Sequence, residues 1–245
     1  MHDPLLPEPA PVRALIFDIG GTVFDWLSAV TAVLDGVPAG QLPPSFAPAQ
    51  FAVAVRSGFF DLYGQVYRGE RGWLTADAIY ASVVADLVSR HGLLDGLQAT
   101  DRAQLDRAWQ AMPAWPDAPG AIAALRGHFV VAPLTILSWT MAVGSSRRAG
   151  IAWDGILSCD LLGIYKPDPR CFARAAEILG CAPAEIIKVA AHPSDLRAAA
   201  ASGFRTAYVR PRLADPGEDY RDTGFAREFD IVAEDFDDLA RQPLD

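Results

Sequence analysis

The stretch Leu15–Trp26, LIFDIGGTVFDW, joins a short apolar run to an aspartate and a pair of glycines. The run is apolar up to Asp18, and Gly20 and Gly21 then interrupt it, which is typical of a buried strand that ends in a tight turn. The glycines let the backbone present N–H groups to an anion, and Thr22 adds a hydroxyl. The stretch predicts a rigid carboxylate at a strand end, although an aspartate in this place also commonly caps the following helix.

The rest of the chain divides into a helical part and a part in which strands and helices alternate. From about Phe24 to Trp115, apolar residues recur at steps of three and four, which predicts helices. After Pro116, helical segments alternate with short apolar runs, which predicts a parallel sheet with helices on both faces. The predicted strands are residues 14–18, 130–137, 155–158, 186–190, 205–209 and 230–232. An α/β core therefore carries a helical insert of about ninety residues between its first and second strands.

Polar residues lie at the carboxyl ends of these predicted strands, where ligands bind in open parallel sheets. Ser138 follows the second strand, Lys166 follows the third, and His192 and Asp195 follow the fourth. Each of them also has an ordinary explanation: Ser138 and Asp195 suit the start of a helix, a single lysine is usually solvated, and a lone histidine is usually incidental. Only their common place in the predicted sheet singles them out.

The order Asp, Ser, Lys, Asp at successive strand ends resembles the four signature motifs of the haloacid dehalogenase superfamily. The matching segments are LIFDIGGTVFDW, LTILSW, GIYKPDP and KVAAHPSDLRAAAASGFRTAYV, and the resemblance covers nearly the whole chain. It implies a Rossmann-like parallel-sheet core and an inserted helical cap domain over the active site. The core is expected at residues 1–25 and 116–245 and the cap at residues 26–115, with Pro116 in the linker.

Two positions argue against the magnesium-dependent phosphatases of this superfamily. Their first motif carries a second aspartate as general acid, and Gly20, which stands in that position, has no proton to give. Their fourth motif carries an aspartate that helps to bind magnesium, and Ala191 stands there. The 2-haloacid dehalogenases lack both acids, so the resemblance implies a hydrolytic 2-haloacid dehalogenase that needs no metal and no cofactor.

In that reaction Asp18 attacks the halogen-bearing carbon of a short 2-haloalkanoic acid, and water hydrolyses the resulting aspartyl ester to the 2-hydroxy acid. The resemblance implies that Lys166 neutralises Asp18 or the substrate carboxylate, and that Asp195 orients Lys166 or activates the water. It implies that His192 helps to position that water. The substrate-binding residues that it implies are Thr22, Ser138 for the carboxylate, Arg56 for the halide, Trp139 and Ile19. As a residue on the surface of the cap, Arg56 is expected to contribute little to folding.

Departures from the dehalogenase pattern leave other activities open. The residue at Gly20 is usually aromatic in those enzymes, and the second motif usually continues Ser-Asn-Gly where this chain has Ser138, Trp139 and Thr140. An indole offers one N–H and a large apolar face in place of an amide. The alternatives are another hydrolase of the superfamily, either a phosphatase or a phosphonate-cleaving enzyme, and a catalytically silent binding protein.

Composition bears on partners and location. The formal net charge of −9 and the lack of a basic stripe argue against a nucleic-acid partner. The three cysteines match no zinc-site spacing. No signal peptide and no apolar run of membrane-spanning length is recognisable, so we expect a cytoplasmic protein with a small-molecule haloacid substrate and, by the same resemblance, a possible homodimer. Residues 211–229, rich in Asp, Arg, Pro and Gly, are expected to form a long surface loop without an assigned role.

Overall fold

The computed structural model describes residues 11–93, 96–216, 218–220 and 224–244, and six parallel strands within them form one sheet. The sheet has the order β3-β2-β1-β4-β5-β6, which places β1 at the centre between β2 and β4. After β1 the chain forms β2 and β3 on one side of β1, and then β4, β5 and β6 on the other side. Ligands bind at such a switch point in α/β sheets. The predicted α/β fold is confirmed. The strands are β1 (Ala14–Phe17), β2 (Val130–Thr135), β3 (Leu157–Ser158), β4 (Ile186–Ala190), β5 (Arg205–Val209) and β6 (Ile231–Ala233).

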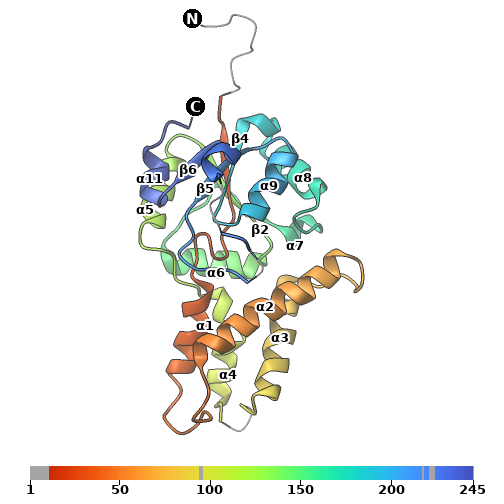
Figure 1. The fold of residues 1–245 in the computed structure, drawn as a ribbon, viewed down its shortest axis with the longest axis vertical. Helices are drawn as coiled ribbons and strands as arrows, with labels where there is room; N and C mark the ends of the chain where they lie inside the picture. Colours follow the sequence, from red (N-terminus) through yellow and green to blue (C-terminus); the bar gives the residue numbers. More distant parts are fainter. Residues whose placement is uncertain (1–10, 94–95, 217, 221–223, 245) are drawn as a thin grey trace, which may run out of the picture.

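Helices cover both faces of the sheet (Figure 1). α5 (Ala118–Arg126) and α11 (Phe236–Arg241) pack together on one face, and α8 (Pro169–Leu179) and α9 (Pro193–Ala201) pack on the other. Every residue of β1 and β4 is buried, as expected for strands that are covered on both sides. The other elements of the core are α6 (Trp139–Ala149), α7 (Cys159–Leu162), α10 (Phe225–Glu228) and the 3₁₀ helix η2 (Pro183–Glu185).

A helical bundle inserted between β1 and β2 forms the cap domain and lies at the end of the sheet where β1 ends (Figure 1). It consists of α1 (Trp26–Asp35), α2 (Pro48–Tyr67), α3 (Ala76–Arg90), α4 (Ala99–Leu105) and the 3₁₀ helix η1 (Ala108–Gln110). Two antiparallel linkers join the bundle to the core. Asp25 N–H donates to the carbonyl of Pro113 (2.8 Å), and Trp115 N–H donates to the carbonyl of Val23 (3.0 Å), so the linkers hold each other in place.

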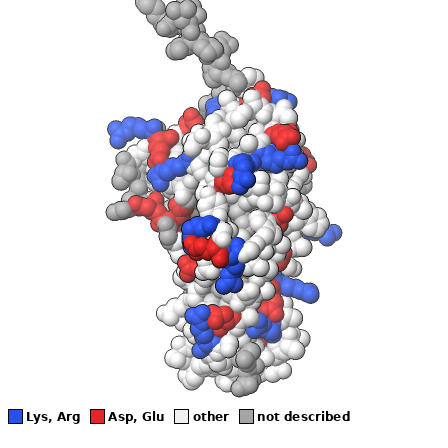
Figure 2. All heavy atoms as spheres, turned by 90° about the vertical axis from the view of Figure 1, so that its right-hand side faces the viewer, with Lys and Arg blue, Asp and Glu red and all other residues white. Residues whose placement is uncertain are grey.

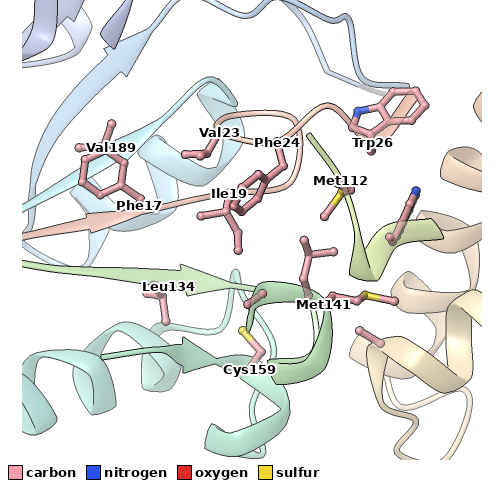
Figure 3. Close-up of a cluster of buried hydrophobic side chains, with 14 of the residues drawn as sticks. Phe17, Ile19, Val23, Phe24, Trp26, Met112, Leu134, Met141, Cys159 and Val189 are labelled. Atoms are coloured by element: carbon pink, nitrogen blue, oxygen red, sulfur yellow. The ribbon is translucent and has the colours of Figure 1, made fainter. Parts of the chain in front are cut away.

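An apolar cluster fills the space between the sheet and the start of the cap (Figure 3). Ile19 and Phe24, from the segment after β1, share it with Met112 from the returning linker and with Met141 from α6. All four side chains are at most 1% exposed. Burial of this kind stabilises a fold by roughly 1.5–3 kcal/mol for each large side chain, so the cluster fixes the segment that follows Asp18.

The surface carries charges of both signs. On the face seen in Figure 2, basic and acidic side chains lie next to one another instead of gathering into a patch of one sign. Within the part of the chain that the structure describes, every helix is too short or too polar to cross a lipid bilayer.

Candidate active site

Asp18 lies directly after β1, at the carboxyl edge of the sheet. Its backbone N–H donates to the carbonyl of Val189 (2.8 Å), which continues the pairing between β1 and β4 up to this residue. The residue is 6% exposed and lines a pocket. The next turn includes Gly21, whose backbone has a φ of +91°, a conformation that side chains disfavour. The local fold therefore presents one carboxylate rigidly at the floor of the pocket.

The two carboxylate oxygens of Asp18 have different surroundings. Oδ2 accepts a hydrogen bond from the hydroxyl of Thr22 (2.9 Å) and lies 3.0 Å from Nδ1 of His192. Oδ1 accepts a hydrogen bond from Nζ of Lys166 (3.2 Å), its single partner among the described residues. Burial alone would raise the pKa of Asp18, but the charges of Lys166 and His192 and the hydrogen bond from His192 hold it well below its ordinary value. Asp18 is therefore ionised, and its Oδ1 has fewer hydrogen-bond partners than its Oδ2.

Lys166 connects Asp18 to Asp195. Its Nζ lies 2.6 Å from Oδ2 of Asp195 and 3.2 Å from Oδ1 of Asp18. Burial would lower the pKa of Lys166, but the charges of the two carboxylates raise it well above its ordinary value. An ammonium has three N–H groups, and these two contacts leave one of them for a ligand.

A second lysine, which was not predicted from the sequence, also faces Asp195. Lys188 is fully buried within β4, and its Nζ lies 3.1 Å from Oδ2 of Asp195 and donates to the carbonyl of Leu134 (3.2 Å). Burial lowers the pKa of Lys188 to about 8. Oδ1 of Asp195 is itself buried and has no partner in the described part of the chain, so it can accept a hydrogen bond from a ligand or water. A lysine inside an apolar strand, IIKVA, was the signal that could have revealed this contact.

His192 lies between two carboxylates. Its Nδ1 faces Oδ2 of Asp18, and its Nε2 makes a hydrogen bond to Oδ2 of Asp215. Burial would lower the pKa of His192, but the hydrogen bonds and charges of these two carboxylates raise it to about 9. Since carboxylates only accept, the ring is an imidazolium that donates from both nitrogens at neutral pH.

Asp215 comes from the segment 211–229, and the expectation that this segment is a surface loop was wrong at this residue. Asp215 is 4% exposed and pairs with Arg56, whose Nε and Nη2 lie 2.6 and 2.9 Å from its two oxygens. Burial would raise the pKa of Asp215, but the charge of Arg56 and the hydrogen bond from His192 lower it to about 2. The segment 211–229 lacks hydrophobic periodicity, so nothing in its pattern signalled a buried carboxylate.

Arg56 reaches this site from α2 of the cap. The expectation that it lies on the cap surface was wrong, because it is 2% exposed and its guanidinium stands 4.6 Å from the ring of Phe60. Nη2 also donates to the carbonyl of Gly20 (3.0 Å), whereas Nη1 donates no hydrogen bond within the described part of the chain. Arg56 thus joins the cap to the core and keeps one donor nitrogen for a ligand.

Four of the residues predicted to bind the substrate do not line the pocket: Thr22, Ser138, Trp139 and Ile19. The Thr22 hydroxyl instead donates to Oδ2 of Asp18. The Ser138 hydroxyl accepts from the N–H of Met141 (3.1 Å) and is 2.8 Å from the hydroxyl of Thr140, so it caps α6. Trp139 is 48% exposed on the surface. The Ile19 side chain points into the apolar cluster of Figure 3. Helix capping accounts for the placement of Ser138, and core packing accounts for that of Ile19.

The pocket has a volume of about 350 Å³, which suits a small molecule. Asp18, Lys166, Asp195, His192 and Arg56 all line it, so the structure brings together the predicted nucleophile and four of its predicted partners. Its other walls are mainly apolar or come from the segment 211–229. They are Gly20, Phe60, Tyr63, Ile136, Leu137, Pro167, Ser194, Pro216 and Glu218.

The side chains of this pocket do not fit a magnesium ion. Gly20 and Ala191 supply no carboxylate, and Oδ2 of Asp195 is already close to the ammonium groups of Lys166 and Lys188. Mg²⁺ needs a near-octahedral set of oxygen ligands, and two ammonium groups would repel it. Across the described residues no cluster of His, Cys, Asp and Glu is arranged to hold a metal ion.

A protein-family model matches residues 12–203, and its description is haloacid dehalogenase-like hydrolase. The chain belongs to the haloacid dehalogenase-like hydrolases. The resemblance found in the sequence motifs is thereby confirmed, and the aspartate, the lysine and the second aspartate of those motifs are the residues that converge in the pocket of this hydrolase.

Two curated relatives of this chain are named (S)-2-haloacid dehalogenases. The hydrolase is 29% identical over 213 residues to (S)-2-haloacid dehalogenase 1 of Pseudomonas sp. strain CBS-3, a match that covers 85% of this chain and 88% of the relative. It is 30% identical over 213 residues to (S)-2-haloacid dehalogenase 4A of Burkholderia cepacia, covering 84% and 86% of the two chains. A crystal structure of an L-2-haloacid dehalogenase superimposes with a TM-score of 0.84 at 29% identity, covering 94% of this chain and 98% of that one.

Proposed function

We propose that this hydrolase is a 2-haloacid dehalogenase, which converts a short (S)-2-haloalkanoic acid to the 2-hydroxy acid and halide through an ester on Asp18. The observation that carries the proposal is the asymmetry of the Asp18 carboxylate. Two donors hold Oδ2, whereas Oδ1 has one partner among the described residues, and Asp18 lines the pocket. Its similarity to (S)-2-haloacid dehalogenases supports the choice of substrate.

In the first step Oδ1 of Asp18 attacks carbon 2 of the substrate from the side opposite the halogen. A bond forms between Oδ1 and carbon 2, and the carbon–halogen bond breaks with its electron pair leaving on the halide. The displacement inverts the configuration at carbon 2. The third N–H of Lys166 is available to the substrate carboxylate, and Nη1 of Arg56 is available to the departing halide.

In the second step water adds to Cγ of the ester. Oδ1 of Asp195, which lacks a partner in the described chain, accepts one water proton and passes it to the alkoxide that leaves as the 2-hydroxy acid. The second water proton is lost to solvent as Asp18 returns to its carboxylate form. Charge develops on Oδ2 of Asp18, where the Thr22 hydroxyl and the His192 N–H already point. His192 cannot take the water proton, because carboxylates engage both of its ring nitrogens.

The remaining predictions belong to the same proposal. The cap extends over residues 26–115 and closes the pocket by bringing Arg56 to Asp215. The enzyme is cytoplasmic and forms a homodimer, and it uses no metal. A phosphatase is less well supported, because Gly20 stands where phosphatases of this superfamily carry their general acid.

Halide release tests this proposal. Chelator-treated protein is incubated with chloro-, bromo- and fluoroacetate and with each enantiomer of 2-chloropropionate, and free halide is measured. We expect release from the (S) enantiomer without added metal and complete loss in Asp18→Asn. Absence of release from every substrate, together with magnesium-dependent hydrolysis of a phosphate ester, would reject the dehalogenase assignment.

A further inference from the structure

Asp215 is buried at the junction of the cap, the pocket and the segment 211–229, and no step above uses it. Its side chain is 1% exposed, and its two oxygens receive three donors: Nε and Nη2 of Arg56 and Nε2 of His192. The phenol oxygen of Tyr220 accepts a hydrogen bond from the backbone N–H of Asp215 (3.1 Å), which fixes the backbone that carries the carboxylate.

The turn after Asp18 is shaped around this carboxylate. A Cβ atom on Gly21 would lie 2.6 Å from Oδ2 of Asp215 and 3.3 Å from the imidazole of His192. A glycine is therefore required there both by its φ of +91° and by the position of the Asp215–His192 pair. The Asp215–His192 pair therefore packs directly against the turn that follows Asp18.

We propose that Asp215 is a positioning residue of the dehalogenase reaction: it keeps His192 doubly protonated and aimed at Oδ2 of Asp18, and it orients Arg56 toward the pocket. The proposal rests on the proposed function. Asp215 touches no reacting atom and acts through His192. The His192 N–H donates to Oδ2 of Asp18 and stabilises the negative charge that develops on this oxygen during ester hydrolysis. Oδ1 is then left as the attacking oxygen.

A merely structural ion pair between Asp215 and Arg56 would hold the cap on the core without controlling the protonation of His192. The contribution of Asp215 to the pKa of His192 depends on the other charged groups around the ring. Asp18 and Asp215 contact the ring directly, and the other charged side chains of the pocket are Arg56, Lys166, Asp195 and Glu218. Removal of one opposite charge in contact with a titratable group shifts its pKa by about 1–3 units.

The test is the titration of His192 in Asp215→Asn, followed by ¹⁵N NMR of histidine-labelled protein. The chain has four histidines, so the resonances can be assigned with His192→Gln. In the native protein we expect both ring nitrogens to be protonated at pH 7.5, with a midpoint near pH 9. In Asp215→Asn we expect the midpoint to fall by about 1–3 pH units. Asp154→Asn, which removes the partner of Arg126 far from the pocket, is the matched control and should leave the midpoint unchanged.

Kinetics give a second readout. With the ester preformed in a single turnover, its hydrolysis in Asp215→Asn should slow at least about threefold at pH 8.5, and the loss should become smaller as the pH is lowered, because low pH restores the proton of His192 in the variant. A neutral His192 in the native protein at pH 7.5 would overturn the proposal even if the variant does not fold. So would an unchanged midpoint and pH profile in the variant. If His192 titrates as expected but no haloacid releases halide, the proposed function fails and the link between Asp215 and His192 stands.

Discussion

Replacing Thr22 by valine removes one of the two donors to Oδ2 of Asp18 while keeping the branched shape. The Thr22 hydroxyl donates to Oδ2 (2.9 Å) and accepts from the backbone N–H of Ala191 (3.0 Å), and the residue is 3% exposed. Valine leaves the Ala191 N–H buried without a partner. We therefore expect Thr22→Val to lower the free energy of unfolding by about 1–3 kcal/mol.

The same change separates the two chemical steps. Negative charge develops on Oδ2 only when water adds to the ester, so the lost donor matters in the second step. Loss of one donor to a developing oxyanion costs roughly 10²–10³-fold in rate, and the His192 N–H remains to give the residual rate. Ester formation uses Oδ1 and should change far less.

Rapid-quench single turnovers with excess enzyme and (S)-2-chloropropionate measure both steps. Halide release reports ester formation, and the appearance of the 2-hydroxy acid reports ester hydrolysis. In Thr22→Val the ester on Asp18 should accumulate and be visible by mass spectrometry, whereas Thr22→Ser, which keeps the hydroxyl, should hydrolyse it at close to the native rate. Slowed halide release without ester accumulation would refute the assignment of the two oxygens.

Two further substitutions test the buried cations. Arg56→Ala removes two of the three donors to the buried carboxylate of Asp215 and should cost about 3–5 kcal/mol in urea unfolding, whereas a loss below 1 kcal/mol would mean that the pair is unimportant for folding. Lys188→Met tests a pH dependence: because burial lowers the folded-state pKa of Lys188 from 10.5 to about 8, the unfolded chain binds its proton more tightly, and native stability should rise relative to the variant between about pH 8 and 10.5. The size expected from that pKa difference is on the order of 3 kcal/mol, and a pH-independent difference between the two proteins would contradict the assignment.

The sequence predicted the parts of the site that follow from local patterns. Asp18, Lys166 and Asp195 each come after an apolar strand, and a parallel sheet brings the carboxyl ends of its strands to one edge. The same rule placed Ser138 at that edge correctly, but it did not specify which way the hydroxyl points, and capping of α6 directs it away from the pocket.

Contacts between distant segments could not be predicted from one sequence. Asp215 meets Arg56 across 159 positions, and it lies in a segment with neither strand nor helix periodicity. The expectation that Arg56 lies on the cap surface failed for the same reason. A charged residue on an amphipathic helix is normally solvated, and the sequence did not reveal the buried carboxylate that pairs with Arg56. Lys188 was hidden because a strand in a buried sheet was treated as apolar throughout.

The ester on Asp18 is tested most directly by one turnover in oxygen-18 water. Water adds to Cγ, and the original Oδ1 leaves with the product, so the account predicts label in the Asp18 peptide and an unlabelled 2-hydroxy acid after a single turnover with excess enzyme. Label in the first-turnover product with none on Asp18 would mean that water attacks the substrate directly, and it would contradict Asp18 as the nucleophile.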